Sequence, residues 1–274
     1  MPRVAVVKGS RGLETVYRAI DLINYPQALD GYDKALVKVN FITTKNWETG
    51  ATTDPLVVEA IIKKLREISV EPTVIESDAT GTNADKAYVM SGMKEMCERI
   101  DVPFINLRRE QEKVEIPIPN KMALSSIKVP RIVTEFPIIS AAKLKTHMQT
   151  GVTLGMKNMF GLLPDKFKGK YHFMGIDEVI LDINTVIKPA ITVIDGFVAM
   201  EGRGPVNGEP VKMETIIAGI DVVATDATAT RVMGIDPQTI KHIKWGHERK
   251  LGEMYDIEVF GDGIDAVKRI FSRR

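Results

Sequence analysis

The sequence predicts an α/β fold with a mostly parallel sheet and helices on both of its faces. Short apolar runs typical of buried strands alternate along the chain with amphipathic segments of helical spacing. The 274 residues, of which 44% are hydrophobic, suffice for a large core. Because no Gly/Ser linker, low-complexity tract or internal repeat divides the chain, we expect a single domain over residues 1–274.

The first half of the chain supplies strands and helices in alternation. Residues 13–23 place apolar side chains at helical spacing. Asp54 and Pro55 are a typical helix start, with Asp as the N-cap and Pro in the first turn. We expect strands at 4–7, 35–39, 73–76 and 102–107, and helices at 13–23, 55–68 and 84–90.

The second half continues the alternation after an interruption. Residues 113–119 alternate polar and apolar side chains and contain prolines, which favours an edge strand or ribbon. We therefore expect a small antiparallel insertion near 108–130, and a helical extension over 236–274. Strands are expected at 136–142, 190–194, 215–219 and 258–260, and helices at 176–187, 222–233, 239–250 and from residue 264.

Charge and cysteine content exclude several classes of protein. The 37 Lys and Arg nearly balance the 36 Asp and Glu, and a net charge of +1 argues against a general nucleic-acid coat. The single cysteine, Cys97, rules out a disulfide scaffold, a Cys-only zinc site and an intrinsic iron–sulfur cluster. We expect Cys97 to be a buried small hydrophobe.

The sequence favours a cytoplasmic protein that does not bind a membrane. Residues 1–8 have a strand pattern that is too short for a signal peptide. No apolar run approaches the roughly 20 residues that span a bilayer. The Ile, Val, Lys and Glu content, with only four Gln, favours an archaeal or thermophilic source.

The segment that follows the predicted strand at 136–142 concentrates polar chemistry. Ligands of parallel sheets bind beyond the carboxyl ends of the strands, and Lys143, Lys145 and His147 follow one directly. Lysines beside backbone amides form anion sites, and a histidine with a pKa near 6.5 can carry a proton. Lys157 follows among apolar residues, where burial lowers the pKa of a lysine and makes its amine nucleophilic.

We therefore predict catalytic roles for His147 and Lys157, with Thr153 and Asn158 beside them as ligand-binding residues. The alternative is that the two lysines before the histidine are solvated and that His147 caps a turn.

His172 lies in a basic loop with Lys166, Lys168 and Lys170. This loop could be a lid whose cations meet an anionic ligand, with His172 as a further catalytic group. It could equally be a solvated loop. Nucleic-acid binding through the three lysines is a third interpretation, against which the net charge argues.

The glycine-rich segment 195–208 carries two further carboxylates. Asp195 and Glu201 could hold a divalent metal or act as a base, and Gly202 and Gly204 allow the backbone to approach a ligand. The alternative is a turn whose carboxylates cap backbone amides. Neither a dinucleotide-binding Gly-x-Gly-x-x-Gly helix start nor a Walker A lysine motif is present.

Earlier polar residues are expected at the same edge of the sheet. Lys38 and Asn40 follow one strand, and Asp78 follows the next. Thr52 and Thr53 precede a helix N-terminus, where hydroxyls and amides suit a phosphate or carboxylate. We predict that all five bind the anion.

Long motifs in these segments resemble the family called domain of unknown function 362, with a core over about 35–235. They are Lys-Val-Asn with Ala-Thr-Thr-Asp-Pro, Lys-Leu-Lys-Thr-His, Val-Thr-Leu-Gly-Met-Lys-Asn-Met-Phe-Gly and Asp-Gly-Phe-Val-Ala-Met-Glu-Gly. Many members carry a fused ferredoxin-like segment whose cysteines this chain lacks. The resemblance therefore implies a separate ferredoxin-type partner if electrons are involved.

The order of His147, Lys157 and His172 is also similar to the N-terminal domain of nickel-pincer lactate racemases. That resemblance implies a histidine, a lysine that bears an organic cofactor, and a second histidine at these positions. One departure is that Ser77 and Asp78 stand where the racemases place a further catalytic histidine. The racemases' C-terminal catalytic domain is not expected here.

These observations together predict an enzyme that acts on a small anionic substrate or cofactor by lysine and histidine chemistry. Isomerisation or redox-linked chemistry is the expected reaction class, with a divalent metal or a lysine-linked organic cofactor as candidate cofactors. The alternative is a non-catalytic module that binds an anionic cofactor or handles a metal for a separate redox partner.

Overall fold

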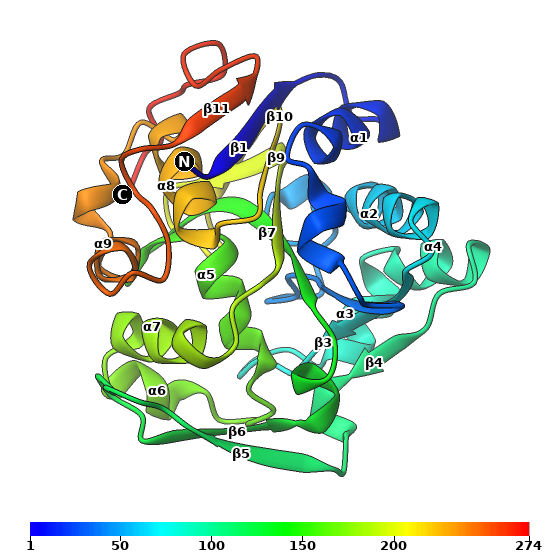
Figure 1. Cartoon of the computed structure of the whole chain (residues 1–274), viewed down its shortest axis with the longest axis vertical. Coiled ribbons are helices and arrows are strands. Elements are labelled where there is room, and N and C mark those ends of the chain that lie inside the picture. The colour runs from blue at the N-terminus through cyan, green and yellow to red at the C-terminus, as the bar shows by residue number, and fades with distance from the viewer. Residues whose placement is uncertain (274) are drawn as a thin grey trace.

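Figure 1 shows the computed structural model of the chain, which describes residues 1–273 and consists of a twisted sheet between two layers of helices. The strand order is β11-β1-β10-β9-β7-β2-β3-β4, and β8 pairs with the end of β7. Five of these pairings are parallel and three are antiparallel. The predicted α/β class, with a mostly parallel sheet, is confirmed.

The N-terminal half supplies β2, β3 and β4 at one edge of the sheet, β1 between β10 and β11 near the other edge, and the helices that cover one face (Figure 1). α2 begins as predicted, because the Asp54 side chain accepts the backbone N–H of Leu56. The elements are β1 (Arg3–Lys8), α1 (Leu13–Asp21), β2 (Lys34–Lys38), α2 (Pro55–Glu67), β3 (Glu71–Glu76), α3 (Ala84–Met90), α4 (Met93–Arg99) and β4 (Phe104–Asn106).

The expected insertion is an antiparallel ribbon of β5 (Lys113–Pro117) and β6 (Ser126–Pro130) that stands apart from the main sheet. The C-terminal half then returns to the sheet and covers its other face. Its elements are β7 (Ile138–His147), β8 (Gly151–Thr153), α5 (Gly155–Asn158), α6 (Gly169–Phe173), α7 (Ile176–Val186), β9 (Ile191–Glu201), β10 (Glu209–Gly219), α8 (Val222–Val232), α9 (Lys241–Glu248) and β11 (Glu258–Gly261).

Each face of the sheet has its own core. One core packs α1, α2 and α4 against residues such as Val37, Val74 and Val193. The other packs α7, α8 and α9 against residues such as Leu36 and Ile194. Because neighbouring residues of a strand point to opposite faces, strands buried on both sides are apolar throughout.

Two strands are longer than predicted. β7 continues beyond residue 142 to His147, because β9 and β8 supply partners for its backbone. β9 continues through the expected glycine-rich turn to Glu201, where it pairs with β10. Gly208 is needed there, since a Cβ would lie 2.2 Å from the carbonyl oxygen of Glu201.

The helix predicted from Ile264 is wrong, whereas the strand predicted at 258–260 is present as β11. Residues 264–268 form only a turn, and β11 adds a strand beside β1. The following segment stays extended because Arg269 and Phe271 donate backbone N–H groups to the carbonyls of Val232 and Met233 at the end of α8. These bonds satisfy carbonyls that a helix end otherwise leaves unpaired.

A buried ion pair joins the centre of the sheet to α2. Lys143 of β7 and Asp195 of β9 are both fully buried, with Nζ 2.7 Å from Oδ2. Asp195 also accepts the backbone N–H of Asp54, the cap of α2, at 2.9 Å. Asp54 in turn forms an ion pair with Arg11 at 2.6 Å.

Replacing only Lys143 is expected to destabilise the fold severely. Lys143→Met leaves the Asp195 carboxylate buried without its cation, which costs about 3–5 kcal/mol of unfolding free energy. The double variant Lys143→Met/Asp195→Asn keeps an acceptor for Asp54 without the charge and should recover much of that loss. Urea denaturation of both single variants and the double variant measures the coupling. If the loss of unfolding free energy in the double variant equals the sum of the losses in the two single variants, Lys143 and Asp195 are not coupled.

Candidate functional site

A cavity of about 390 Å³ lies at the carboxyl ends of β2, β3 and β7, the edge at which parallel sheets bind ligands. Its other walls come from the loop at 77–81, from α5 with the turn that follows it, and from α6. Its polar and charged lining residues are Lys38, Asn40, Glu76, Ser77, Thr80, Lys145, His147, Gln149, Thr153, Lys157, Asn158, Lys168 and His172.

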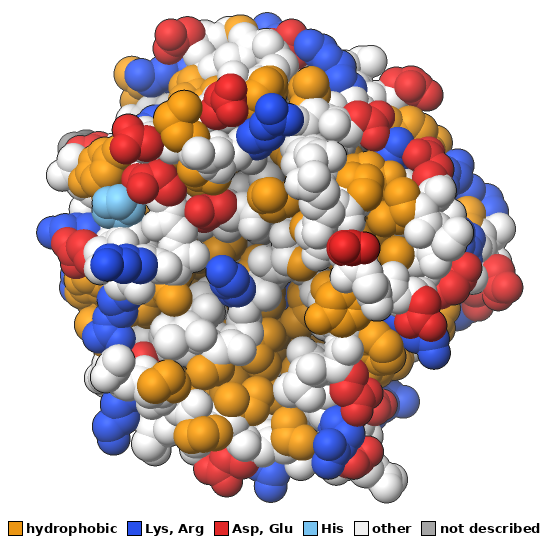
Figure 2. Space-filling view, in the orientation of Figure 1, with side chains coloured by type: hydrophobic (Ala, Val, Ile, Leu, Met, Phe, Trp, Pro, Cys, Tyr) orange, Lys and Arg blue, Asp and Glu red, His pale blue; other side chains and the backbone are white. Residues whose placement is uncertain are grey.

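Among residues 1–273, four lysines but only one carboxylate line this cavity, which we call the lysine cavity. The lysines are Lys38, Lys145, Lys157 and Lys168, and the carboxylate is Glu76. On the outer face drawn in Figure 2, acidic and basic side chains are instead interspersed. The net charge of +1 therefore conceals a local excess of cations inside the chain.

The charge of Lys38, the last residue of β2, is paired with a carboxylate on the neighbouring strand β3. Its Nζ lies 2.7 Å from Oε1 of Glu76, the last residue of β3, and both side chains are buried. Burial lowers the pKa of Lys38, and Glu76 opposes that effect. The turn above the pair requires Gly161, because a Cβ there would lie 2.4 Å from the Lys38 Nζ.

Lys145 is held by neutral acceptors instead of a carboxylate. It is fully buried, and its Nζ donates to Oδ1 of Asn40 at 2.7 Å and to the carbonyl oxygen of Ala51 at 2.6 Å. The pKa of Lys145 lies well below its ordinary value because of burial and the neighbouring cation of Lys157. Asn40 is oriented by Asn158, whose Oδ1 accepts its side-chain N–H at 3.1 Å.

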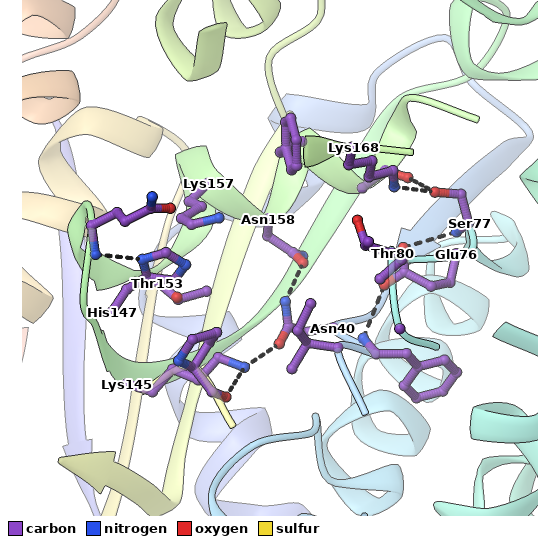
Figure 3. Close-up of a pocket in the computed structure, with 18 of the residues that line it drawn as sticks. Asn40, Glu76, Ser77, Thr80, Lys145, His147, Thr153, Lys157, Asn158 and Lys168 are labelled. Atoms are coloured by element: carbon purple, nitrogen blue, oxygen red, sulfur yellow. Dashed lines mark hydrogen bonds between the residues drawn. The ribbon is translucent and has the colours of Figure 1, made fainter. Parts of the chain in front are cut away.

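Lys168 and Lys157 approach the cavity from opposite walls (Figure 3). Lys168 donates to the hydroxyl of Ser77 at 2.7 Å. The Lys157 Nζ lies 5.3 Å from the centre of the Phe160 ring and has no hydrogen-bond or ion-pair partner within residues 1–273. Burial lowers the pKa of each of these two lysines to about 8, so their amines are partly neutral near that pH.

His147 is fixed as a neutral hydrogen-bond donor. Its Nδ1 accepts the backbone N–H groups of Gln149 at 3.2 Å and Thr150 at 3.3 Å, which assigns the ring proton to Nε2. Burial, with the cations of Lys157 and Lys145, lowers the pKa of His147 to about 2. In the ligand-free protein this ring is therefore a donor and not a proton acceptor.

Thr153 and His172 complete this wall of the cavity. The hydroxyl of Thr153 is buried without a hydrogen-bond partner among the described residues. His172 bonds through Nδ1 to the side-chain oxygen of Gln149, which ties α6 to the turn after β7. Figure 3 shows Thr153, His147 and Lys157 on the same side of the cavity.

Three predicted anion-binding residues, Thr52, Thr53 and Asp78, lie outside the cavity lining. The hydroxyl of Thr53 donates to the carbonyl of Ala141, and Thr52 is fully buried outside the cavity lining. Asp78 accepts N–H groups from Ala84 and the Asn106 side chain.

Three more predicted anion-binding residues also lie outside the cavity lining. Lys143 is occupied by Asp195. Gly202 donates its backbone N–H to Ser272. Gly204 lets the chain pass close to β7, since a Cβ would lie 2.0 Å from the carbonyl oxygen of Thr146.

The two predicted metal ligands are not brought together. Asp195 pairs with Lys143, whereas Glu201, six residues along β9, pairs with Arg269 at 3.0 Å. Over residues 1–273, no group of three or more His, Cys, Asp or Glu side chains is placed to hold a metal ion.

Glu76 lines the cavity and was missed by the sequence reasoning. Ser77 and Thr80 belong to a polar segment at 77–81 that the sequence marks as informative, but of which only Asp78 was predicted to bind the ligand. Glu76 had a usable signal, because it ends a predicted strand beside the one that ends near Lys38. Ser77 and Thr80 lie in the polar loop after that strand, where nothing in the local pattern distinguishes a cavity wall from a solvated turn.

The comparisons with known proteins assign the chain to a family. Residues 35–231 match the model of the family described as domain of unknown function, DUF362. The chain belongs to the DUF362 family. It is also 30% identical over 214 residues to the thylakoid-associated protein sll1697 of Synechocystis.

That alignment covers 76% of the chain and 65% of the cyanobacterial relative, so the DUF362 chain spans less than two thirds of the relative's length. No solved structure matches the DUF362 chain. Within residues 1–273, none of the helices is long and apolar enough to cross a membrane.

Removing the Lys157 amine is expected to stabilise the ligand-free protein. A lysine pKa lowered from 10.5 to about 8 means that its charge opposes folding at neutral pH, so Lys157→Met should raise the unfolding free energy by about 1–3 kcal/mol at pH 7. In the wild type, stability should rise between pH 8 and 10.5, because the folded state loses this proton first. Urea denaturation at pH 7 and 9.5 measures both effects.

The matched control is Lys166→Met, which removes an exposed lysine near the same cavity and should change stability by less than about 0.5 kcal/mol. A loss of stability in Lys157→Met, without a change in the control, would show that Lys157 serves packing instead.

The His147 ring is expected to stay neutral between pH 5 and pH 8 in the ligand-free protein. Its Nδ1 is occupied by two N–H donors and its pKa is lowered to about 2. Nitrogen NMR of the histidine rings should show the Nε2–H form of His147 throughout this range. Titration of His147 near pH 6.5 would contradict the geometry.

Proposed function

We propose that the chain is an enzyme that binds a small organic anion, a carboxylate or phosphate, in the lysine cavity and acts on it with lysine and histidine chemistry. One observation carries this proposal: Lys145, Lys157 and Lys168 line one cavity without a carboxylate partner among the described residues. A buried charge without a counterion costs several kcal/mol. An anionic ligand would supply the missing charge.

The free hydrogen-bonding capacity around the cavity suits such a ligand. Lys168 uses one ammonium proton on Ser77 and keeps two. His147 can donate from Nε2, and the Thr153 hydroxyl has no partner within residues 1–273. We assign anion binding to the lysines, orientation of the ligand to His147 and Thr153, and proton transfer to Lys157, whose pKa of about 8 suits that task.

Proton transfer at carbon is the chemistry that these side chains suit best. Isomerisation, the chemistry of the lactate racemases, requires proton transfer at carbon. Lys157, whose pKa is about 8, supplies the proton-transfer group, and His147 orients the ligand beside it. Lys157, His147 and His172 would also fit a lysine-linked organic cofactor, which would supply redox or hydride chemistry when bound. A separate ferredoxin-type partner would then supply electrons.

The location in the cell is likewise a proposal. The sequence favours the cytoplasm, whereas the Synechocystis relative is named for its association with thylakoids. A peripheral association of this chain with a membrane is compatible with the absence of a spanning helix in residues 1–273.

Anion binding is expected to stabilise the protein specifically. Inorganic phosphate, oxalate and lactate, each titrated in a thermal unfolding assay at constant ionic strength, should raise Tm more than sodium chloride does. Saturation at 100 times Kd corresponds to about 2.7 kcal/mol. The effect should weaken above pH 8, where Lys157 and Lys168 lose their protons.

Matched variants separate the cavity from the general charge of the protein. Lys168→Met should remove most of the anion-induced shift, and Lys166→Met, which alters an exposed lysine, should keep it. Equal stabilisation by chloride and by the three anions, or equal shifts in both variants, would sink the proposed anion site.

A further inference from the structure

Lys157 differs from the other three lysines of the cavity in having a free amine. Lys38 is bound to Glu76, and Lys145 and Lys168 donate to neutral oxygens. The Lys157 Nζ has no such partner within residues 1–273, and its nearest defined feature is the face of the Phe160 ring. Anion binding alone explains a cation at this position. It does not explain why the Lys157 amine is held by no hydrogen bond or ion pair, whereas the other three lysines are.

We propose that Lys157 is a nucleophile that forms an imine with an anionic aldehyde or ketone, a 2-oxo carboxylate or a phosphorylated carbonyl compound. This inference rests on the proposed function, because the other lysines must first hold the anionic group. It deepens that function by naming the substrate class.

The surrounding residues suit each part of such a substrate. Lys168, on the wall opposite Lys157, has two protons free for a carboxylate or phosphate. His147 and Thr153 lie on the same side as Lys157 (Figure 3), so the Nε2–H of His147 can donate to a carbonyl oxygen while the amine approaches its carbon. Burial of Lys157 disfavours its charged form, and the centre of the Phe160 ring lies 5.3 Å from the amine as an aromatic neighbour.

The step balances without an oxidant or a reductant. The lone pair of the neutral amine attacks the carbonyl carbon and gives a carbinolamine. The carbonyl oxygen then leaves as water, taking both protons that the amine carried, and a C=N bond replaces the C=O bond. Protonation of the imine nitrogen makes it an electron sink for proton transfer at the adjacent carbon, which connects this step to isomerisation.

The amine is available for this attack near neutral pH. With a pKa of about 8, the neutral fraction of Lys157 at pH 7.5 exceeds that of a lysine with the ordinary value of 10.5 by on the order of 100-fold. Exposed Lys166 is therefore an internal reference for non-specific reaction.

Borohydride trapping tests the inference. The full chain is first weighed by intact mass spectrometry, then incubated at pH 7.5 with pyruvate, glyoxylate, 2-oxoglutarate or dihydroxyacetone phosphate and sodium cyanoborohydride, and finally mapped by peptide mass. We expect one reduced adduct per chain, on Lys157, with at least one probe and at least tenfold more than on Lys166. The probe that reacts distinguishes an oxo acid from a phosphorylated carbonyl compound.

Lys157→Arg keeps the cation but cannot form an imine, so it should lose the adduct and retain anion-induced stabilisation. Lys166→Met should retain both. Should the arginine variant fail to fold, the adduct position in the wild-type peptide map decides the question.

The outcomes separate the two proposals. Stabilisation by anions without any Lys157 adduct overturns the imine and leaves the anion site in place. Neither stabilisation nor an adduct overturns both. Adducts spread evenly over exposed lysines, or a modification already present on Lys157 in the purified chain, also overturn the imine.

Discussion

The neutralisation of buried lysine ammonium groups is the constraint on which this structure depends. Lys38 and Lys143 each meet a carboxylate on the neighbouring strand, Glu76 of β3 and Asp195 of β9. Each pair therefore bridges two parallel strands, and Asp195 also holds the start of α2 through the backbone of Asp54. These pairs favour close packing at the carboxyl edge of the sheet, because burying either ammonium without its carboxylate would cost several kcal/mol.

The remaining lysines show a graded loss of compensation away from these pairs. Lys145 is held by the dipoles of Asn40 and Ala51, Lys168 by one hydroxyl, and Lys157 by no polar group among the described residues. Partial dipoles do not cancel a full charge in a medium of low dielectric constant. The cavity thus keeps a positive electrostatic potential from lysines that form no ion pair between strands. Such a potential is expected of a site that binds an anion.

Local periodicity explains why much of the fold could be predicted from the sequence. Buried strands, the cap at Asp54 and the ribbon near 108–130 depend on neighbouring residues. The position of Lys145, His147 and Lys157 around one cavity followed from the rule about strand ends.

The roles of Lys143 and Asp195 could not be predicted, because their pairing joins residues 52 positions apart. The extension of β9 to Glu201 was missed because glycine within a strand resembles a turn until its partner strand β10 is known. The helix expected from Ile264 was lost to long-range contacts for the same reason: backbone bonds to the end of α8 outweigh its helical pattern.

The bond between Lys168 and Ser77 has a consequence for ligand exchange. Lys168 belongs to the segment that forms one wall of the cavity, and Ser77 follows β3 on the sheet side. A single ammonium group therefore both fastens that wall and faces the cavity in which we propose that an anion binds. An anion that binds the Lys168 ammonium group would change the strength of the hydrogen bond between Lys168 and Ser77. If an anion binds Lys168 as proposed, the equilibrium between the fastened and the released wall is linked to occupancy of the cavity.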